Sequence, residues 1–326
     1  MSSAIGGQSK REHAAPSGGM GHGKLLLFGE HAAVYGYPAC GITLPLSATV
    51  EIREGGTGRW ELPAMEEGRR ETLERFLDHA RGCLPKESPW GGRLAIESNL
   101  PEGVGFGSSA AWCVAFASAV TGEAPPSSTL WEAAHRAEGF FHGTPSGIDT
   151  GLALLDGLYS FLPKPPGLPA FEPLRGGPLH LIVGAVPREG TTRRLVGALR
   201  ARLERGDSGA RKAVERLGEV SARAIDALRA PQTDPGSLAL LVNEAQELLA
   251  ALGLSSRLLD EMVAAGRAAG ALGGKLSGAG GGGAYYLLFA DAESAARSLA
   301  PLKRKAIELG IGQESLLFTL SRPSEG

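Results

Sequence analysis

Cysteine is scarce in this 326-residue chain, which holds only Cys40, Cys83 and Cys113. Their wide spacing excludes a Cys-x-x-Cys metal or redox site, and a sparse, odd number indicates reduced thiols in a cytosol-like compartment. No apolar run approaches the roughly 20 residues that a membrane-spanning helix needs, and the first residues lack the apolar core of a signal peptide. We therefore expect a cytoplasmic protein without a membrane partner.

An excess of charge of either sign is also missing. The chain has 33 Lys and Arg against 35 Asp and Glu, which gives a net charge of −2. This balance does not favour binding to nucleic acid or to an anionic membrane surface. Glycine, in contrast, is abundant with 48 residues, about twice the usual share of 7%. Because apolar patterns persist throughout and no Gly-X-Y repeat occurs, these glycines indicate backbone that approaches ligands.

The order of predicted elements indicates an α+β fold with two domains. Residues 1–21 are rich in Ser, Gly and Ala without periodicity, so we predict a disordered arm there. Buried or alternating apolar runs predict strands at 24–28, 48–53, 93–97, 179–186, 284–289 and 316–320. Helical patterns cover 69–80, 108–120, 129–141, 192–205, 210–229, 237–251, 256–268 and, interrupted by Pro301, 292–309. We place the boundary near residue 178, which gives domains 22–178 and 179–326.

The segment from Pro101 to Ala111 reads Pro-Glu-Gly-Val-Gly-Phe-Gly-Ser-Ser-Ala-Ala, between a predicted strand and a predicted helix. Its glycines allow sharp turns, and a helix start adds unpaired N–H groups and the positive end of the dipole. Together these features favour phosphate binding. Ser108 and Ser109 could cap the helix, or one could ligate a metal. The pattern is neither a Walker A loop nor a dinucleotide fingerprint, and an ordinary capped glycine turn is the alternative.

A second glycine-rich segment, Lys275 to Ala284, contains Gly278, Gly280 and Gly283 in a Gly-x-Gly-x-x-Gly pattern. We expect a helix before it and a strand after it, which is the reverse of a dinucleotide site. The segment is therefore interpreted as another N–H-rich loop that could close on phosphates. A tight helix-to-strand connection is the alternative.

Two further segments carry polar side chains that suit catalysis. In the first, a predicted strand beginning at Lys24 is followed by Glu30 and His31, where mixed folds commonly place ligand-binding groups. In the second, Glu138 lies on a predicted helix and Asp149 follows a Pro-Ser-Gly turn. Two carboxylates near a phosphate loop suggest one metal ligand and one base. The alternatives are a helix N-cap for Asp149 and a solvated helix face for Glu138. Taken alone, Lys24 or His31 would more often be structural or solvated than functional.

These four segments, in this order, resemble the motifs of the GHMP kinase superfamily, and within it those of the mevalonate kinases. Lys24 to Gly36 resembles the first motif, with Ala-Ala-Val after Glu-His where galactokinases carry Thr-Asp-Tyr. Residues 101–111 are similar to the phosphate loop, 142–149 to the segment with the mevalonate kinase aspartate, and 275–283 to the third motif. Residues 187–196 are similar to a substrate-side segment, with one residue more than expected before Thr192.

The chain also departs from the family pattern. Phe106 stands where the superfamily usually has Leu, which would reshape the nucleotide loop, and the N-terminal arm has no family counterpart. His142, at the start of the segment with the aspartate, is assigned a structural role in a turn.

The resemblance implies a two-domain GHMP kinase fold with the active site in the cleft between the domains. It implies phosphorylation of the primary 5-hydroxyl of mevalonate, with ATP as co-substrate and Mg²⁺ as cofactor, in isoprenoid precursor biosynthesis. Asp149 would orient the hydroxyl and accept its proton, and Lys24 would stabilise charge on the attacking oxygen. Ser109 and Glu138 would hold Mg²⁺.

Binding residues follow from the same resemblance. The nucleotide would contact Pro101, Gly103, Val104, Gly105, Phe106, Gly107, Ser108, Ser109, Ala110, Gly278, Ala279 and Gly280. The substrate would contact Lys24, Glu30, His31, Ser146, Asp149, Thr192 and Arg193. Among these, Arg193 offers a bidentate fork for the substrate carboxylate. The alternatives are a sibling kinase acting on phosphomevalonate or a sugar, and a non-catalytic GHMP-fold binding protein. The sequence leaves a homodimer open.

Overall fold

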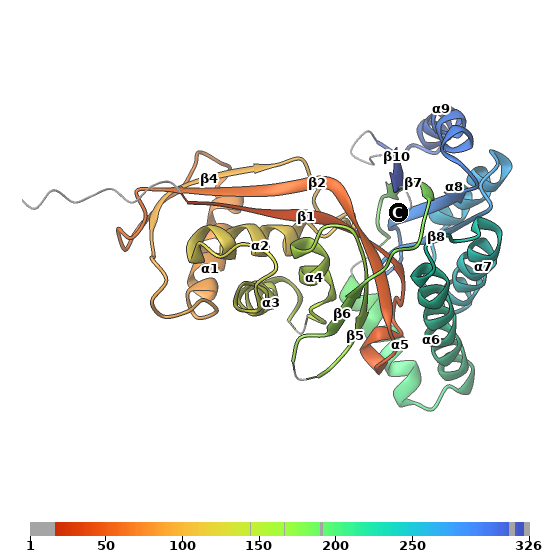
Figure 1. Ribbon diagram of the computed structural model, residues 1–326, viewed down its shortest axis with the longest axis horizontal. Helices are drawn as coiled ribbons and strands as arrows, with labels where there is room; N and C mark the ends of the chain where they lie inside the picture. Colours follow the sequence, from red (N-terminus) through yellow and green to blue (C-terminus); the bar gives the residue numbers. More distant parts are fainter. Residues whose placement is uncertain (1–16, 144, 166, 190–191, 313–316, 323–326) are drawn as a thin grey trace, which may run out of the picture.

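The computed structural model describes residues 17–143, 145–165, 167–189, 192–312 and 317–322, without the side chains of Thr192 and Arg193. Its elements form two sheets with helices packed on them, and Figure 1 shows two halves that meet at one end of the long β1–β2 ribbon. The α+β class is thus confirmed.

The first sheet has the strand order β3-β4-β2-β5-β6, and β1 pairs with β2. Its strands are β1 (Ser17–Phe28), β2 (Ala39–Arg53), β3 (Trp60–Glu61), β4 (Gly92–Ser98), β5 (Leu158–Leu162) and β6 (Ala170–Pro173). The pairing of β3 with β4 is parallel, and the other pairings are antiparallel. On one side lie α1 (Glu67–Arg81), α2 (Ser108–Thr121), α3 (Ser128–His142) and α4 (Ile148–Leu154) (Figure 1). The short helix η1 (Ala33–Tyr35) connects β1 to β2.

The second sheet is antiparallel, with the strand order β10-β7-β9-β8. Its strands are β7 (Leu179–Val186), β8 (Gly273–Leu276), β9 (Gly283–Phe289) and β10 (Leu317–Arg322). The helices of this half are α5 (Thr192–Glu204), α6 (Ser208–Arg229), α7 (Pro235–Ala251), α8 (Arg257–Ala268) and α9 (Ala292–Glu308). Helix α9 runs through Pro301 without a break, although the sequence predicted an interruption there.

The glycines at the start of β1 serve close packing and do not mark disorder. Residues 17–21, which the sequence placed in a disordered arm, pair with β2, so that boundary was wrong. A Cβ atom on Gly21 would lie 2.1 Å from the carbonyl oxygen of Ala111, and one on Gly19 would lie 2.1 Å from that of Ala115. Both carbonyls belong to α2, so only glycine lets β1 lie this close to the helix. Composition alone cannot separate this use of glycine from a flexible arm.

Helix α2 is buried on all sides, as its small and apolar sequence predicted. Its burial fixes the position of its N-terminus, at residue 108, beside the glycine segment 101–107. The chain passes from one sheet to the other between β6 and β7, where we placed the domain boundary. The apolar core is nevertheless shared, because Leu25, Leu27 and Phe28 of β1 pack in the same cluster as β7 and β9. The end of β1 is therefore held by both halves.

The second glycine-rich segment is a strand-to-strand connection. Lys275 lies in β8, which pairs antiparallel with β9, whereas the sequence predicted a helix directly before the loop. A strand of four residues is too short to give a periodic signal, so the end of α8 and the start of β8 could not be separated. The loop 277–282 consequently leaves and re-enters the same sheet.

Candidate active site

The phosphate loop, residues 101–107, has the backbone that its glycines predicted. Gly103, Gly105 and Gly107 have φ angles of 75°, 100° and 78°, in the left-handed region that favours glycine. Gly107 is the N-cap of α2, and no side chain caps this helix in the described structure. The first-turn N–H groups of α2 are thus left for a ligand, and the dipole adds positive potential. The arrangement suits a phosphate group.

Phe106 points away from this loop surface. Its side chain is fully buried and its ring packs against that of Phe318, with ring centroids 6.3 Å apart. Its carbonyl accepts a hydrogen bond of 2.8 Å from the backbone N–H of Lys24. Only the backbone of Phe106 is therefore placed to contact a nucleotide. Its aromatic side chain anchors the loop in the apolar core.

Lys24 and Asp149 form an ion pair beside the phosphate loop. Lys24 Nζ lies 3.1 Å from Asp149 Oδ2, which joins the end of β1 to the first turn of α4. The stem of Lys24 lies against Gly107, where a Cβ atom would come within 2.7 Å of Lys24 Cγ. Lys24 is 4% exposed, while the Asp149 side chain keeps 37% of its surface open. The aspartate is therefore accessible to a substrate, and the ammonium group sits between it and the phosphate loop.

Glu138 is a buried carboxylate, which rejects the solvated helix face considered for it. The side chain is 1% exposed, and neither carboxylate oxygen has a hydrogen-bond partner among the described residues. Burial, helped by the negative charge of Asp149, raises the pKa of Glu138 to about 8, and the positive charge of Lys24 opposes this rise. An unpartnered buried carboxylate is costly, so a cation is the partner that this position fits.

Ser109 and His142 link the phosphate loop to the end of α3. Ser109 Oγ and His142 Nε2 share a hydrogen bond of 3.1 Å. His142 follows Glu138 by four residues, so both occupy the same face of α3. Burial lowers the pKa of His142, while Asp149 opposes the effect and Lys24 adds to it. The hydroxyl of Ser109 is thus directed toward the helix that carries Glu138, although the sequence assigned His142 only a structural role.

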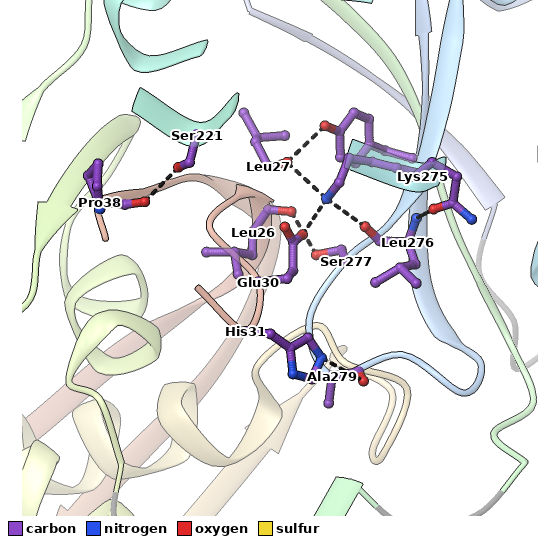
Figure 2. Close-up of polar contacts among 12 residues, drawn as sticks. Leu26, Leu27, Glu30, His31, Pro38, Ser221, Lys275, Leu276, Ser277 and Ala279 are labelled. Atoms are coloured by element: carbon purple, nitrogen blue, oxygen red, sulfur yellow. Dashed lines mark hydrogen bonds and ion pairs between the residues drawn. The ribbon is translucent and has the colours of Figure 1, made fainter. Parts of the chain in front are cut away.

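Glu30, predicted from the sequence to contact the substrate, has a buried partner within the protein. Its carboxylate is buried and forms an ion pair with Lys275 Nζ at 2.5 Å (Figure 2). Burial raises the pKa of Glu30 and lowers that of Lys275, and the opposite charges counteract both shifts. Residues 30 and 275 are far apart in sequence, so no local pattern could reveal this partner.

His31 is also turned toward the second glycine loop. Its Nε2 lies 3.1 Å from the carbonyl oxygen of Ala279 (Figure 2). Because a carbonyl only accepts, Nε2 carries the proton and Nδ1 is left as an acceptor. Burial lowers the pKa of this imidazole, and its φ of 59° is unusual for a residue with a side chain. His31 is therefore held in a strained position beside the loop.

Arg188, which sequence analysis did not select, reaches both glycine-rich loops. A Cβ atom on Gly105 would lie 2.9 Å from Arg188 Nη2, and one on Gly283 would lie 2.9 Å from its Nε. Burial lowers the pKa of this guanidinium, and its charge lowers the pKa of His142. The signal was present, because Arg188 belongs to the segment 187–196 that resembles a substrate-side motif. Only the fold shows that its side chain turns toward the phosphate loop.

The other residues predicted to bind the substrate are Ser146, Thr192 and Arg193. Ser146 Oγ accepts a hydrogen bond of 3.3 Å from the backbone N–H of Ile148, which fixes the turn before α4. Thr192 and Arg193 begin α5, but their side chains lie outside the described part of the structure. Two surface hollows among the described residues lie elsewhere, one beside the first residues of β1 and the other between α8 and α9.

Comparison with known proteins identifies the family of this chain. Residues 70–157 match the family model for the GHMP kinases N terminal domain, and residues 224–308 match GHMP kinases C terminal. A mevalonate kinase of Thermococcus gammatolerans is 32% identical over 83% of this chain and 88% of its own length. A mevalonate kinase of Pyrococcus furiosus is 32% identical over 92% of this chain and 94% of its own length.

A solved structure agrees at the level of the fold. The crystal structure of L. major mevalonate kinase in complex with R-mevalonate superposes with a TM-score of 0.77 at 24% identity. The match covers 96% of this chain and 97% of the other. With two family models in the expected order and relatives above 30% identity over most of its length, the chain belongs to the GHMP kinase family, among the mevalonate kinases.

Proposed function

We propose that this chain transfers the γ-phosphoryl group of ATP to the primary 5-hydroxyl of mevalonate, which gives 5-phosphomevalonate. The observation that carries the proposal is the Lys24–Asp149 pair, with its accessible carboxylate next to an uncapped helix N-terminus. The relatives matched over most of the chain are mevalonate kinases, which supports the choice of substrate.

The reaction needs groups that position two substrates and stabilise negative charge. The phosphate loop and the first turn of α2 bind the polyphosphate through backbone N–H groups. The carboxylate of Asp149 accepts a hydrogen bond from the substrate hydroxyl and aims its oxygen at the γ-phosphorus. Lys24 stabilises charge on that oxygen as the new bond forms. Arg188, at the contact of the two glycine loops, adds a second cation for the phosphates or the substrate carboxylate.

Proton transfer to the carboxylate accompanies bond formation and does not precede it. A free carboxylic acid and an alcohol differ by roughly 12 pKa units, which corresponds to about 16 kcal/mol for complete proton loss before attack. Once the oxygen is bonded to phosphorus its basicity falls, and Asp149 can then take the proton. The role of Asp149 is therefore first to orient the hydroxyl and then to accept its proton.

Magnesium fits the residues around Glu138. The buried carboxylate without a partner and the Ser109 hydroxyl on the facing helix would hold Mg²⁺. No cluster of three or more His, Cys, Asp or Glu suited to a metal occurs in the described ranges. Mg²⁺ usually takes one or two protein ligands together with substrate phosphates and water, so one carboxylate and one hydroxyl would be enough protein ligands. When bound, Mg²⁺ neutralises charge on the phosphate oxygens.

The proposal is tested by ATP turnover on a panel of alcohols. We expect ADP release with mevalonate, and at most background release with phosphomevalonate, galactose or no acceptor. Preferred turnover of phosphomevalonate or galactose would assign the chain to a sibling kinase. Nucleotide binding without turnover on any acceptor would indicate a non-catalytic binding protein.

A further inference from the structure

Lys275 is a cation with no capacity left for a ligand. Its side chain is fully buried, and its Nζ donates to Leu27 O at 3.1 Å, to Leu276 O at 2.8 Å and to Glu30 Oε1. An ammonium group has three donors, so all of them are used. Figure 2 shows that two of the acceptors come from the end of β1 and its following turn, and one from β8. Lys275 therefore joins the two halves of the molecule instead of facing a substrate.

Glu30 extends this junction into the second glycine loop. The backbone N–H of Gly278 favours the charged form of this carboxylate and so lowers its pKa, against the larger effect of burial. On either side of Gly278, Ser277 Oγ donates to Leu26 O at 2.8 Å and His31 bonds to Ala279 O (Figure 2). Ser277 and Ala279 of the loop are thus tied by hydrogen bonds to residues 26–31 of the first half. These contacts fix the position of the start of the loop relative to the first half.

The first residues of β9, directly after the same loop, meet the phosphate loop. A Cβ atom on Gly283 would lie 3.0 Å from the carbonyl oxygen of Val104, and one on Gly105 would lie 3.3 Å from Ala284 Cβ. The loop 277–282 is therefore anchored at its start by the Glu30–Lys275 pair, and the first residues of β9, directly after it, are packed against the phosphate loop. We expect a change in the anchor to alter the distance between the two glycine loops.

We propose that Glu30 and Lys275 are positioning residues whose buried pair sets the second glycine loop at the distance from the phosphate loop that ATP binding requires. The inference rests on the proposed function, because it takes ATP as the ligand of both loops. Neither residue touches the substrate in this account, and the pair acts through the backbone that leads from β8 into the loop.

The kinetic test compares Glu30→Gln with a matched control, Ser221→Ala. Ser221 Oγ donates to Pro38 O at 2.6 Å, so the control also removes a buried contact between the halves but leaves the loop untouched (Figure 2). We expect Glu30→Gln to raise the KM for ATP about tenfold or more, since misplacement of about 1 Å can cost 10²-fold. The KM for mevalonate should stay within about twofold, and the control should change neither constant. A raised KM for mevalonate alone, or a loss of stability with both constants unchanged, would overturn the proposal.

A double variant keeps the test valid if Glu30→Gln fails to fold. Glu30→Met with Lys275→Met leaves no unpaired charge in the interior, and such replacements often preserve stability. The double variant should melt near the wild-type temperature yet bind a non-hydrolysable ATP analogue at least tenfold more weakly in calorimetry. Wild-type affinity for the analogue would refute the positioning role. Because this readout needs no turnover, it remains decisive even if mevalonate is not the acceptor.

Discussion

Substituting Glu138 by Gln should make the ligand-free protein more stable, and only at neutral to alkaline pH. Burial and the charge of Asp149 raise the pKa of Glu138 from 4.5 to about 8. At about 1.36 kcal/mol for each pKa unit, the ionised carboxylate costs the folded state about 5 kcal/mol. Glutamine has a similar shape and no charge, so the variant does not carry this cost.

The sign of the pH dependence follows from proton binding. Between pH 4.5 and about 8 the folded protein retains a proton that the unfolded chain has released. The free energy of unfolding therefore falls as pH rises through this window, and the full penalty is present above about pH 8. At pH 5 both side chains are neutral in the folded state, so wild type and variant should differ little.

The assay is thermal unfolding without nucleotide or Mg²⁺ at pH 5 and pH 8.5. At pH 8.5 we expect the melting temperature of Glu138→Gln to exceed that of wild type by up to about 10 °C, at about 2 °C for each kcal/mol. At pH 5 the two melting temperatures should be nearly equal. Glu132→Gln, on the exposed surface of the same helix, is the matched control and should shift neither melting temperature. Glu138→Gln should also raise the Mg²⁺ concentration needed for activity. An equal difference between variant and wild type at both pH values would show that Glu138 ionises freely, and the reasoning would fail.

The remaining predictions concern turnover, substrate binding and packing. Asp149→Asn should lower kcat by about 10²–10⁴-fold in steady-state kinetics, while calorimetry should show that an ATP analogue still binds. A wild-type kcat would show that Asp149 serves only the local structure at the start of α4. Arg188→Ala should lower kcat/KM for mevalonate by one to two decades, because a charge-assisted contact contributes about 1.5–3 kcal/mol. The decrease should be larger than in Arg193→Ala, and the reverse order would favour Arg193 as the partner of the substrate carboxylate. Gly21→Val should destabilise the fold by about 1–3 kcal/mol in chemical denaturation, because its Cβ meets the Ala111 carbonyl; an unchanged midpoint would show that β1 can move off α2.

Signals carried by consecutive residues predicted much of the fold. The apolar run 179–186 became β7 with the same ends, and the glycine-to-serine segment at 101–109 became a turn leading into α2. In both, the residues that specify the structure lie next to one another, so local backbone preferences suffice. The strand predicted at 24–28 likewise lies within β1, although β1 already begins at Ser17.

Features that depend on distant partners could not be predicted in this way. The ion pair of Glu30 could not be predicted, because its partner, Lys275, lies on a strand of the other sheet. Glycines 19 and 21 suggested disorder because the helix that requires them begins at residue 108. Arg188 was overlooked because its role depends on two loops that meet only in the folded chain. Each error concerns a residue whose environment is built by tertiary contact.

The most direct test of the central claim is the identity of the phosphorylated product. Wild-type protein incubated with ATP, Mg²⁺ and R-mevalonate should give one new phosphomonoester signal in proton-coupled ³¹P NMR. Phosphate on the primary oxygen couples to a neighbouring CH₂ group, so the signal should be a triplet, and Asp149→Asn should suppress it. A singlet would place the phosphate on the tertiary oxygen, and the absence of any new phosphomonoester would contradict the assignment of mevalonate as the acceptor.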